Sequence, residues 1–133
     1  MQSNDIIIHT DGACKGNPGP GGWGAVIEQN GGQVKISGSE PHTTNNRMEM
    51  TAVIKGLETI DPSAKVLISS DSTYVINTMT KGWKRKANHD LWEQLDRLAG
   101  SRSISWRWVR GHSGDRGNEL ADALATKAAG TAK

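Results

Sequence analysis

The 133-residue sequence contains no phenylalanine, four prolines and a single cysteine, Cys14. One cysteine excludes an internal disulfide and is typical of proteins in a reducing compartment. No apolar run approaches the roughly 20 residues of a membrane-spanning helix. The N-terminus is polar and the apolar run behind it is too short for a signal peptide. We therefore expect a cytoplasmic protein that does not enter a membrane.

The composition is that of a globular protein without a strong charge bias. Hydrophobic residues make up 35% and charged residues 23%, and the formal net charge is +2. A chain of this length can bury a core of its own, and no repeat or linker divides it. We expect one domain over residues 1–133, acting as a monomer. The slight positive charge is compatible with a polyanionic partner but does not require one.

Two short segments rich in β-branched residues each lead into an aspartate. They are Ile6–Asp11 and Val66–Asp71. An apolar run without alternation predicts a strand buried on both faces, as in the centre of an α/β sheet. If the two strands are parallel neighbours, Asp11 and Asp71 meet at the edge where such sheets bind ligands. Adjacent carboxylates repel one another, and a divalent cation between them would relieve the repulsion.

The other elements are predicted from turn residues and apolar spacing. The glycine- and proline-rich segment 12–22 predicts a loop. Strands 23–28 and 33–37 are predicted to form a hairpin around Asn30-Gly31-Gly32. The spacing of apolar residues further along predicts helices 46–60, 72–81, 90–99 and 118–129, with a strand over 104–109. This order predicts an α/β fold with a mixed sheet flanked by helices.

The role of Glu49 is open at this point. On helix 46–60 it lies at the border of an apolar stripe formed by Met50, Val53, Ile54, Leu57 and Ile60. Asn46 and Glu49 also have the spacing of a capping box, and a glutamate in the first turn complements the helix dipole. The helix alone favours capping over catalysis.

Two other carboxylates have structural interpretations as well. Asp71 is placed to cap the helix that follows it. Asp122, on helix 118–129, is predicted to lie opposite a stripe of Leu120, Leu124 and Ala128. By helix geometry it would be a solvated surface residue. Only the position of Asp11, at the end of a strand expected to be central, favours a ligand site over turn chemistry.

The histidines differ in their surroundings. His112 is flanked by glycines on a predicted mobile loop, 111–117, and is either an ordinary exposed histidine or a functional one. His9 lies inside the first strand and is expected to be structural. His42 and His89 are expected at the surface.

Four groups of residues, in order along the chain, resemble the motifs of type 1 ribonuclease H. They are His9-Thr10-Asp11-Gly12-Ala13 with Gly16-Asn17-Pro18-Gly19, then Thr43-Thr44-Asn45-Asn46-Arg47-Met48-Glu49, then Ser70-Asp71-Ser72 with Tyr74-Val75, and finally Trp108-Val109-Arg110-Gly111-His112-Ser113-Gly114 with Asn118-Glu119-Leu120-Ala121-Asp122. One such motif is weak evidence, but the set is specific and spans nearly the whole chain.

The resemblance implies a ribonuclease H-like fold, with a five-stranded mixed sheet in the order 3-2-1-4-5. It implies endonucleolytic cleavage of the RNA strand of RNA–DNA hybrids, leaving 5′-phosphate and 3′-hydroxyl ends. It also implies two divalent cations, Mg²⁺ or its substitute Mn²⁺, and no small-molecule cofactor. The carboxylates that bind the cations match Asp11, Glu49, Asp71 and Asp122. A family histidine that assists proton movement or product departure matches His112.

Substrate contacts are implied by the same resemblance. Asn17, Asn45 and Asn46 match positions that contact the minor groove or the strands flanking the cut. Thr44 matches a residue of the pocket that holds a DNA phosphate. Loop and cap roles are the ordinary alternative for these residue types. Thr73 occupies a position at which many family members have a glutamine that contacts the minor groove.

The chain departs from many bacterial relatives between its second and third helices. Those relatives carry an inserted helix and basic loop that grip the DNA strand, whereas here only Lys81-Gly82-Trp83-Lys84-Arg85-Lys86 bridges the gap. Basic residues around an aromatic side chain suit backbone contact with a stacking surface, although a solvated turn is the alternative. We expect a reduced DNA-strand contact through Trp83 and Lys84. A hybrid-binding module with little turnover, or another ribonuclease-H-like nuclease or strand-transfer enzyme, is the alternative function.

Overall fold

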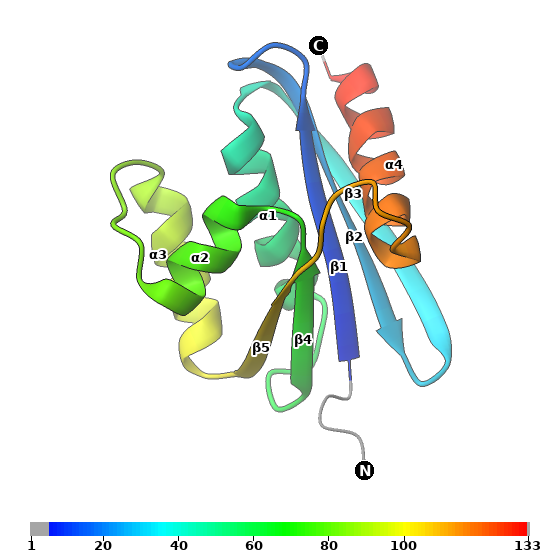
Figure 1. Cartoon of the computed structure of the whole chain (residues 1–133), viewed down its shortest axis with the longest axis vertical. Helices are drawn as coiled ribbons and strands as arrows, with labels where there is room; N and C mark the ends of the chain where they lie inside the picture. The colour runs from blue at the N-terminus through cyan, green and yellow to red at the C-terminus, as the bar shows by residue number, and fades with distance from the viewer. Residues whose placement is uncertain (1–5, 133) are drawn as a thin grey trace.

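The computed structural model describes residues 6–132 and contains one five-stranded mixed sheet (Figure 1). Its strands are β1 (Ile6–Cys14), β2 (Gly19–Gln29), β3 (Gly32–Thr43), β4 (Lys65–Ser70) and β5 (Ser103–Trp108), in the order β3-β2-β1-β4-β5. β1 pairs antiparallel with β2 and parallel with β4. The predicted strand order and the predicted parallel neighbours are both confirmed.

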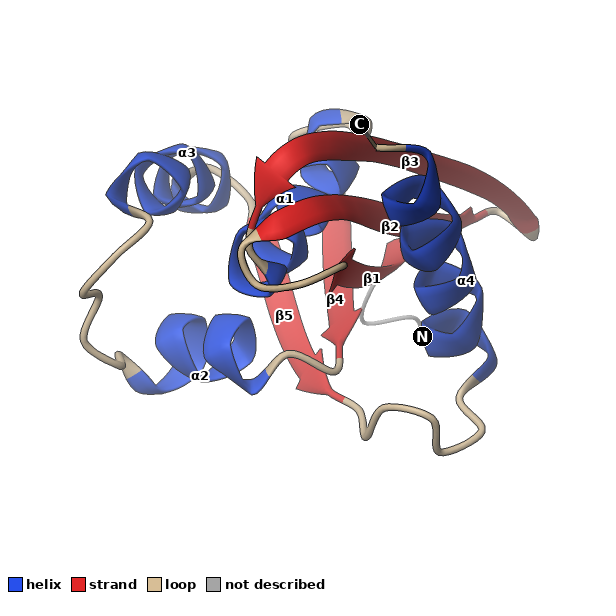
Figure 2. Cartoon of the chain, turned by 90° about the horizontal axis from the view of Figure 1, so that it is seen from above, coloured by secondary structure: helices blue, strands red, loops and turns tan. Residues whose placement is uncertain are grey.

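Helices cover both faces of this sheet. They are α1 (Asn45–Glu58), α2 (Thr73–Lys81), α3 (His89–Gly100) and α4 (Arg116–Thr131). Seen from above, α1 and α4 lie on opposite faces of the sheet, while α2 and α3 lie toward its β5 edge (Figure 2). Among residues 6–132, no helix is both long and apolar enough to span a membrane.

The main core lies between the sheet and α1. Ile6 and Ile8 of β1 are fully buried there, and Gly56 allows α1 to approach Ile8 closely. Each such side chain contributes about 1.5–3 kcal/mol through burial. The predicted apolar stripe is confirmed, because Met50, Val53, Ile54 and Leu57 of α1 are buried, as is Ile60 just beyond its end.

The opposite face of the sheet has a different packing surface. A Cβ added at Gly22 would stand 2.4 Å from the Ala125 carbonyl oxygen, and one at Gly24 would stand 2.6 Å from the Ala121 carbonyl oxygen. The backbone of α4 therefore rests directly on β2. The buried side of α4 accordingly consists of small residues and one amide, Asn118, Ala121, Ala125, Ala128 and Ala129. Of the predicted stripe, Ala128 is buried, whereas Leu120 and Leu124 are only half-buried.

These glycines also explain why the prediction of a loop over 12–22 was wrong. β1 continues to Cys14 and β2 begins at Gly19, so only residues 15–18 connect the strands. The glycines are needed for close contact with helices, and composition alone made them resemble turn residues. Asp11 therefore lies within β1. Only the pairing of β1 with β4 stops there, at the pair Thr10–Ser70.

The helix caps differ from those predicted for the two carboxylates. The hydroxyl group of Thr44 caps α1 by accepting a hydrogen bond from the Arg47 backbone N–H at 3.2 Å. The hydroxyl group of Ser72 caps α2 in the same way, from the Val75 N–H. The capping roles considered for Glu49 and Asp71 are therefore wrong, and both carboxylates are available for another purpose.

Candidate active site

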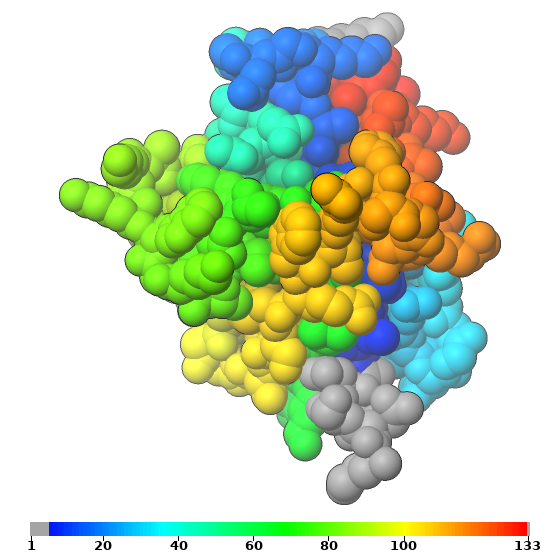
Figure 3. Space-filling view, viewed as in Figure 1, coloured from blue at the N-terminus to red at the C-terminus, as the bar shows by residue number. Residues whose placement is uncertain are grey.

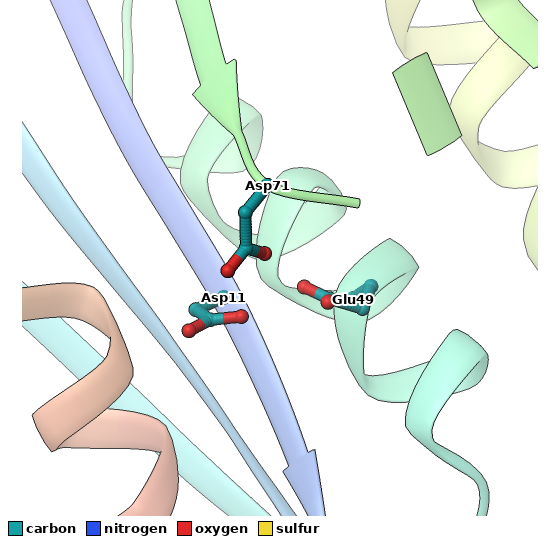
Figure 4. Close-up of side chains that lie close together, drawn as sticks. All are labelled: Asp11, Glu49 and Asp71. Carbon is teal, nitrogen blue, oxygen red and sulfur yellow. The ribbon is translucent and has the colours of Figure 1, made fainter. Parts of the chain in front are cut away.

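Three carboxylates converge where β1 and β4 cease to pair. Asp11 comes from β1, Asp71 follows the last residue of β4, and Glu49 comes from the first turns of α1 (Figure 4). One carboxylate oxygen from each residue can be chosen so that all three lie within 4.8 Å of one another. Glu49 can enter from the α1 side because the sheet opens after the pair Thr10–Ser70.

Gly12 brings Glu49 to this cluster. A Cβ at position 12 would stand 2.5 Å from the Glu49 backbone nitrogen and 2.7 Å from the Met48 carbonyl carbon. The start of α1 therefore lies directly against β1, one residue after Asp11. The Gly12 N–H also donates a hydrogen bond to Asp11 Oδ1 at 2.9 Å, which fixes that carboxyl group.

Burial makes this cluster electrostatically unfavourable without a cation. Asp11 and Glu49 are only 4% and 5% exposed. Desolvation, followed by the charge of Asp71, raises the pKa of Asp11 to about 8. Desolvation, followed by the charges of Asp11 and Asp71, raises the pKa of Glu49 well above its usual range. Both shifts express the cost of holding like charges together in a poorly hydrated site.

The donor set suits a divalent cation. Carboxylate oxygens are the ligands preferred by Mg²⁺ and similar hard ions. The Glu49 Oε1 atom is buried and has no hydrogen-bond partner among the described residues. A buried acceptor without a donor is costly, and a bound cation would satisfy it. The three residues Asp11, Glu49 and Asp71 therefore form a candidate metal site.

Asp122 lies on the other side of Asp11. It is half-buried rather than solvated, and its side chain interacts with the Asp11 carboxyl group, which contributes to the raised pKa of Asp11. The prediction of a surface residue failed because α4 packs through alanines onto the glycines of β2. This contact turns the Asp122 side of the helix toward β1. The structure thus brings Asp11, Glu49 and Asp71 into one cluster and turns Asp122 toward Asp11.

The loop after β5 closes the side next to Asp71. The Trp108 indole Nε1 donates a hydrogen bond to the Asp71 carbonyl oxygen at 3.1 Å. A Cβ at Gly111 would stand 2.8 Å from Asp71 Oδ2. His112, next in the chain, is exposed and has a φ of 56°. The structure thus places the loop that carries His112 against Asp71 and leaves His112 accessible from solvent.

The asparagines and the threonine predicted to contact substrate lie where the β1–β2 loop meets α1. The Asn45 backbone N–H donates a hydrogen bond to Asn17 Oδ1 at 2.9 Å. Asn17, Asn45 and Asn46 are exposed, and Thr44 is half-buried as the helix cap. Thr73 is exposed at the first residue of α2. Asn17 therefore has a loop role and Thr44 a cap role, as the alternative interpretation predicted. The exposed asparagine side chains remain accessible to a ligand.

The sequence did not single out Arg47, which ties this region to α3. Its guanidinium donates hydrogen bonds to both Asp90 carboxylate oxygens, at 3.0 and 2.8 Å, and to Asn88 Oδ1 at 3.2 Å. The hydrogen bonds from Arg47, together with its positive charge, lower the pKa of Asp90 to about 2. A motif shows that Arg47 is near Glu49, but its partners are more than 40 positions away. Nothing local in the sequence identifies them.

Residues 82–88 connect α2 directly to α3 without a further helix, as expected from the sequence. The connection projects from one edge of the molecule and is yellow-green in Figure 3. The Arg85 guanidinium lies 4.8 Å above the Trp92 ring, and it donates hydrogen bonds to both carboxylate oxygens of Asp96. Trp83, 48% exposed, and Lys84 lie outward. Arg85 is therefore an anchor that the sequence alone did not distinguish from its basic neighbours.

The strand order and the converging carboxylates define a ribonuclease H-like fold with an acidic centre suited to divalent metal. The sequence profile of the ribonuclease H family matches residues 3–130. Ribonuclease H from Maricaulis maris is 51% identical over 134 aligned residues, which cover 90% of each chain. Ribonuclease H from Polaromonas naphthalenivorans is 50% identical, over 95% of this chain and 88% of its own. The protein belongs to the ribonuclease H family.

Solved structures agree with this assignment. LC9-RNase H1, described as a type 1 RNase H with the type 2 active-site motif, superposes with a TM-score of 0.84. It is 33% identical, over 100% of this chain and 75% of its own. LC11-RNase H1, solved in complex with an RNA/DNA hybrid, gives a TM-score of 0.80 at 27% identity, over 94% of this chain and 96% of its own.

Proposed function

We propose that Asp11, Glu49, Asp71 and Asp122 form the catalytic centre with which this ribonuclease hydrolyses the RNA strand of RNA–DNA hybrids. The observation that carries the assignment is the convergence of buried carboxylates at the opening between β1 and β4. Buried carboxylates repel one another, so a folded protein keeps them together where they have a function. A polyanionic substrate can approach them only when a bound cation neutralises their negative charge.

The residues suit two Mg²⁺ ions, with Mn²⁺ as a substitute. Asp11, Glu49 and Asp71 would hold one ion, and Asp11 together with Asp122 would hold the other. When bound, such a pair of ions supplies an activated water and stabilises the departing 3′ oxygen of the scissile phosphodiester. The Gly12 N–H and the Gly111 backbone hold Asp11 and Asp71 in place for this purpose.

His112 is proposed to transfer a proton or assist product departure. His112 is exposed and follows Gly111, which packs against Asp71, so its imidazole is open to solvent next to the proposed site. Histidine is the side chain that most often acts as a general acid or base, which suits either role. The Ser113 hydroxyl donates a hydrogen bond to the Arg110 carbonyl oxygen, and this bond shapes the turn that carries His112.

The proposed partner is an RNA–DNA hybrid bound through its minor groove and its DNA backbone. Asn17, Asn45 and Asn46 would contact the groove, where 2′-hydroxyl groups distinguish RNA from DNA. Thr44 would contact a DNA phosphate, and Thr73 lies exposed at the start of α2 for a further groove contact. Trp83 and Lys84 would contact the DNA strand further away. LC11-RNase H1 was solved with such a hybrid, which supports this class of partner.

The decisive experiment is a cleavage assay on a labelled RNA–DNA hybrid. We expect cleavage in Mg²⁺ or Mn²⁺, no cleavage in excess chelator, and none by Asp11→Asn. Glu93→Gln is a matched carboxylate-to-amide control, because Glu93 is exposed on α3 and pairs with Arg97. Full cleavage by Asp11→Asn, or in chelator, would refute the assignment. Binding of hybrid without any cleavage by the unaltered protein would favour a binding module instead.

A further inference from the structure

The imidazole ring of His9 lies beneath the first turn of α4. His9 is 5% exposed, and a Cβ added at Gly117 would stand 2.1 Å from its Nδ1 atom and 2.2 Å from Cε1. The backbone of α4 at Gly117 is therefore in direct contact with the ring, with no space for a side chain between them. Neither residue belongs to the proposed catalytic set.

A hydrogen bond to Glu28 holds the His9 ring in one orientation. His9 Nε2 and Glu28 Oε1, on the neighbouring strand β2, are 2.7 Å apart. With Glu28 ionised, Nε2 carries the proton and donates it to the carboxylate. Nδ1 is then a bare lone pair, which agrees with its lack of a partner among the described residues. The ring therefore cannot easily rotate or tilt away from α4.

The contact lies in line with two of the proposed catalytic residues. His9 and Asp11 are two residues apart on β1 and point to the same face of the sheet. Gly117 and Asp122 are on α4, five residues apart in sequence. Two residues of strand and five of helix both advance about 7 Å. Gly117 thus meets His9 one step before Asp122 meets Asp11.

The two ends of α4 rest on different surfaces. From Ala121 onward the helix backbone lies against Gly22 and Gly24, where β2 has no side chain. At its N-terminus it rests on a complete imidazole ring. A ring at one end and bare backbone at the other determine the tilt of the helix over the sheet. Asp122 directly follows Ala121, where the helix first lies against Gly24, and it is five residues after the contact of Gly117 with His9.

We propose that His9 is a positioning residue that fixes the height of α4 above β1, and thereby the separation of Asp122 from Asp11. The inference rests on the proposed function, because it concerns the cation that these two carboxylates would share. A purely structural His9 would affect only stability. A positioning His9 also affects the affinity for metal.

The test changes the size of the two groups that meet at this contact, the side chain at position 9 and the side chain at position 117. Gly117→Ala inserts a methyl group against the ring, and because Ala is the better helix former, helix propensity by itself would favour this variant. His9→Ala removes the ring, and the double variant does both. His9→Phe keeps a ring without the hydrogen bond to Glu28. Gly130→Ala is the matched control, since it is on the same helix and its nearest neighbour is the Lys15 Nζ atom at 3.7 Å.

Two quantities are measured for each variant: Mn²⁺ binding by calorimetry without nucleic acid, and the Mg²⁺ concentration for half-maximal cleavage. Substitutions behind metal ligands weaken metal affinity by about 10–100-fold, so we expect a loss of about tenfold for Gly117→Ala and for His9→Ala. The double variant should recover part of the loss, and His9→Phe and Gly130→Ala should resemble the unaltered protein. Circular dichroism establishes that each variant is folded.

The proposal is overturned if the single variants keep normal Mn²⁺ affinity while losing only stability, or if the double variant is no better than the worse single one. If Gly117→Ala does not fold, the comparison of His9→Ala with His9→Phe decides, since the first adds no atom beneath the backbone of Gly117 and the second adds a single ring carbon. Failure of the proposed function is a separate result, in which the unaltered protein itself does not cleave the hybrid.

Discussion

Gly111 lies so close to Asp71 that a Cβ at position 111 would stand 2.8 Å from the Asp71 Oδ2 atom. The two residues follow the neighbouring parallel strands β5 and β4. The absence of a side chain at Gly111 lets the loop after β5 pack against a carboxylate of the site. The same loop carries His112, the residue after Gly111. One glycine therefore supports both a proposed metal ligand and a proposed proton carrier.

Replacing Gly111 with alanine is expected to impair catalysis without unfolding the protein. The added methyl group has to displace the Asp71 carboxylate, the flexible partner in the contact. We expect the catalytic rate to fall by about tenfold or more, as for other disturbances behind metal ligands. Gly100→Ala is the control, because nothing lies within 4 Å of a Cβ there. Steady-state kinetics with thermal unfolding measures both effects, and an unchanged rate in Gly111→Ala would show that Asp71 need not hold this position.

The acidic cluster is expected to make the stability of the metal-free protein depend on pH. The pKa of Asp11 is raised to about 8 in the folded state, so the protonated form is favoured there. The stability from this group is complete below its unfolded pKa of about 3.9 and is lost as the pH rises through 8. Mg²⁺ should restore stability at pH 8 by binding the folded state.

Asp11→Asn isolates this effect, because the amide cannot ionise. Each unit by which a pKa is raised corresponds to about 1.4 kcal/mol, and relief of one or two units would stabilise the metal-free protein by about 1–3 kcal/mol at pH 8. The difference should vanish near pH 4. Urea unfolding in chelator at both pH values measures it. Equal stability of the two proteins at pH 8 would mean that ionisation of Asp11 does not destabilise the metal-free protein.

Lys84 is expected to contribute to hybrid binding mainly by neutralising phosphate charge. Lys84→Ala should weaken binding and reduce the slope of log affinity against log salt by about one. The catalytic rate at saturating substrate should stay the same. Lys35→Ala removes the same charge from exposed β3, at the other edge of the sheet, and serves as the control. Identical salt slopes for the two variants would place the DNA strand elsewhere.

Arg85 is expected to matter through its position, although its charge equals that of its neighbours. Its planar group bonds two Asp96 oxygens while stacking on Trp92, which a lysine cannot reproduce. Arg85→Lys should therefore weaken hybrid binding by releasing the connection that carries Trp83 and Lys84. Lys84→Arg, an exposed exchange in the other direction, should have little effect. Electrophoretic mobility shifts at constant salt compare them, and normal binding by Arg85→Lys would show that anchoring is unimportant.

Local sequence predicted the central features of the fold because they depend on short-range patterns. The apolar runs before Asp11 and Asp71 indicated adjacent buried strands, and the stripe on α1 indicated its buried face. The motifs then indicated a ribonuclease H, and the strand order and the relatives confirm that family. The glycine-rich segment was misinterpreted because glycine serves both turns and close packing, and composition does not distinguish these uses.

The sequence by itself, through its resemblance to ribonuclease H motifs, indicated four carboxylates as candidates for the chemistry. Only the tertiary structure decided which of them are buried, which do not cap a helix and which lie close together. Asp122 changed from a predicted surface residue to a neighbour of Asp11 because β2 presents glycines to α4, and Glu49 lost its predicted capping role because Thr44 performs it. Positions such as these depend on contacts between segments far apart in the chain. The periodicity of a single helix cannot show what the helix rests on.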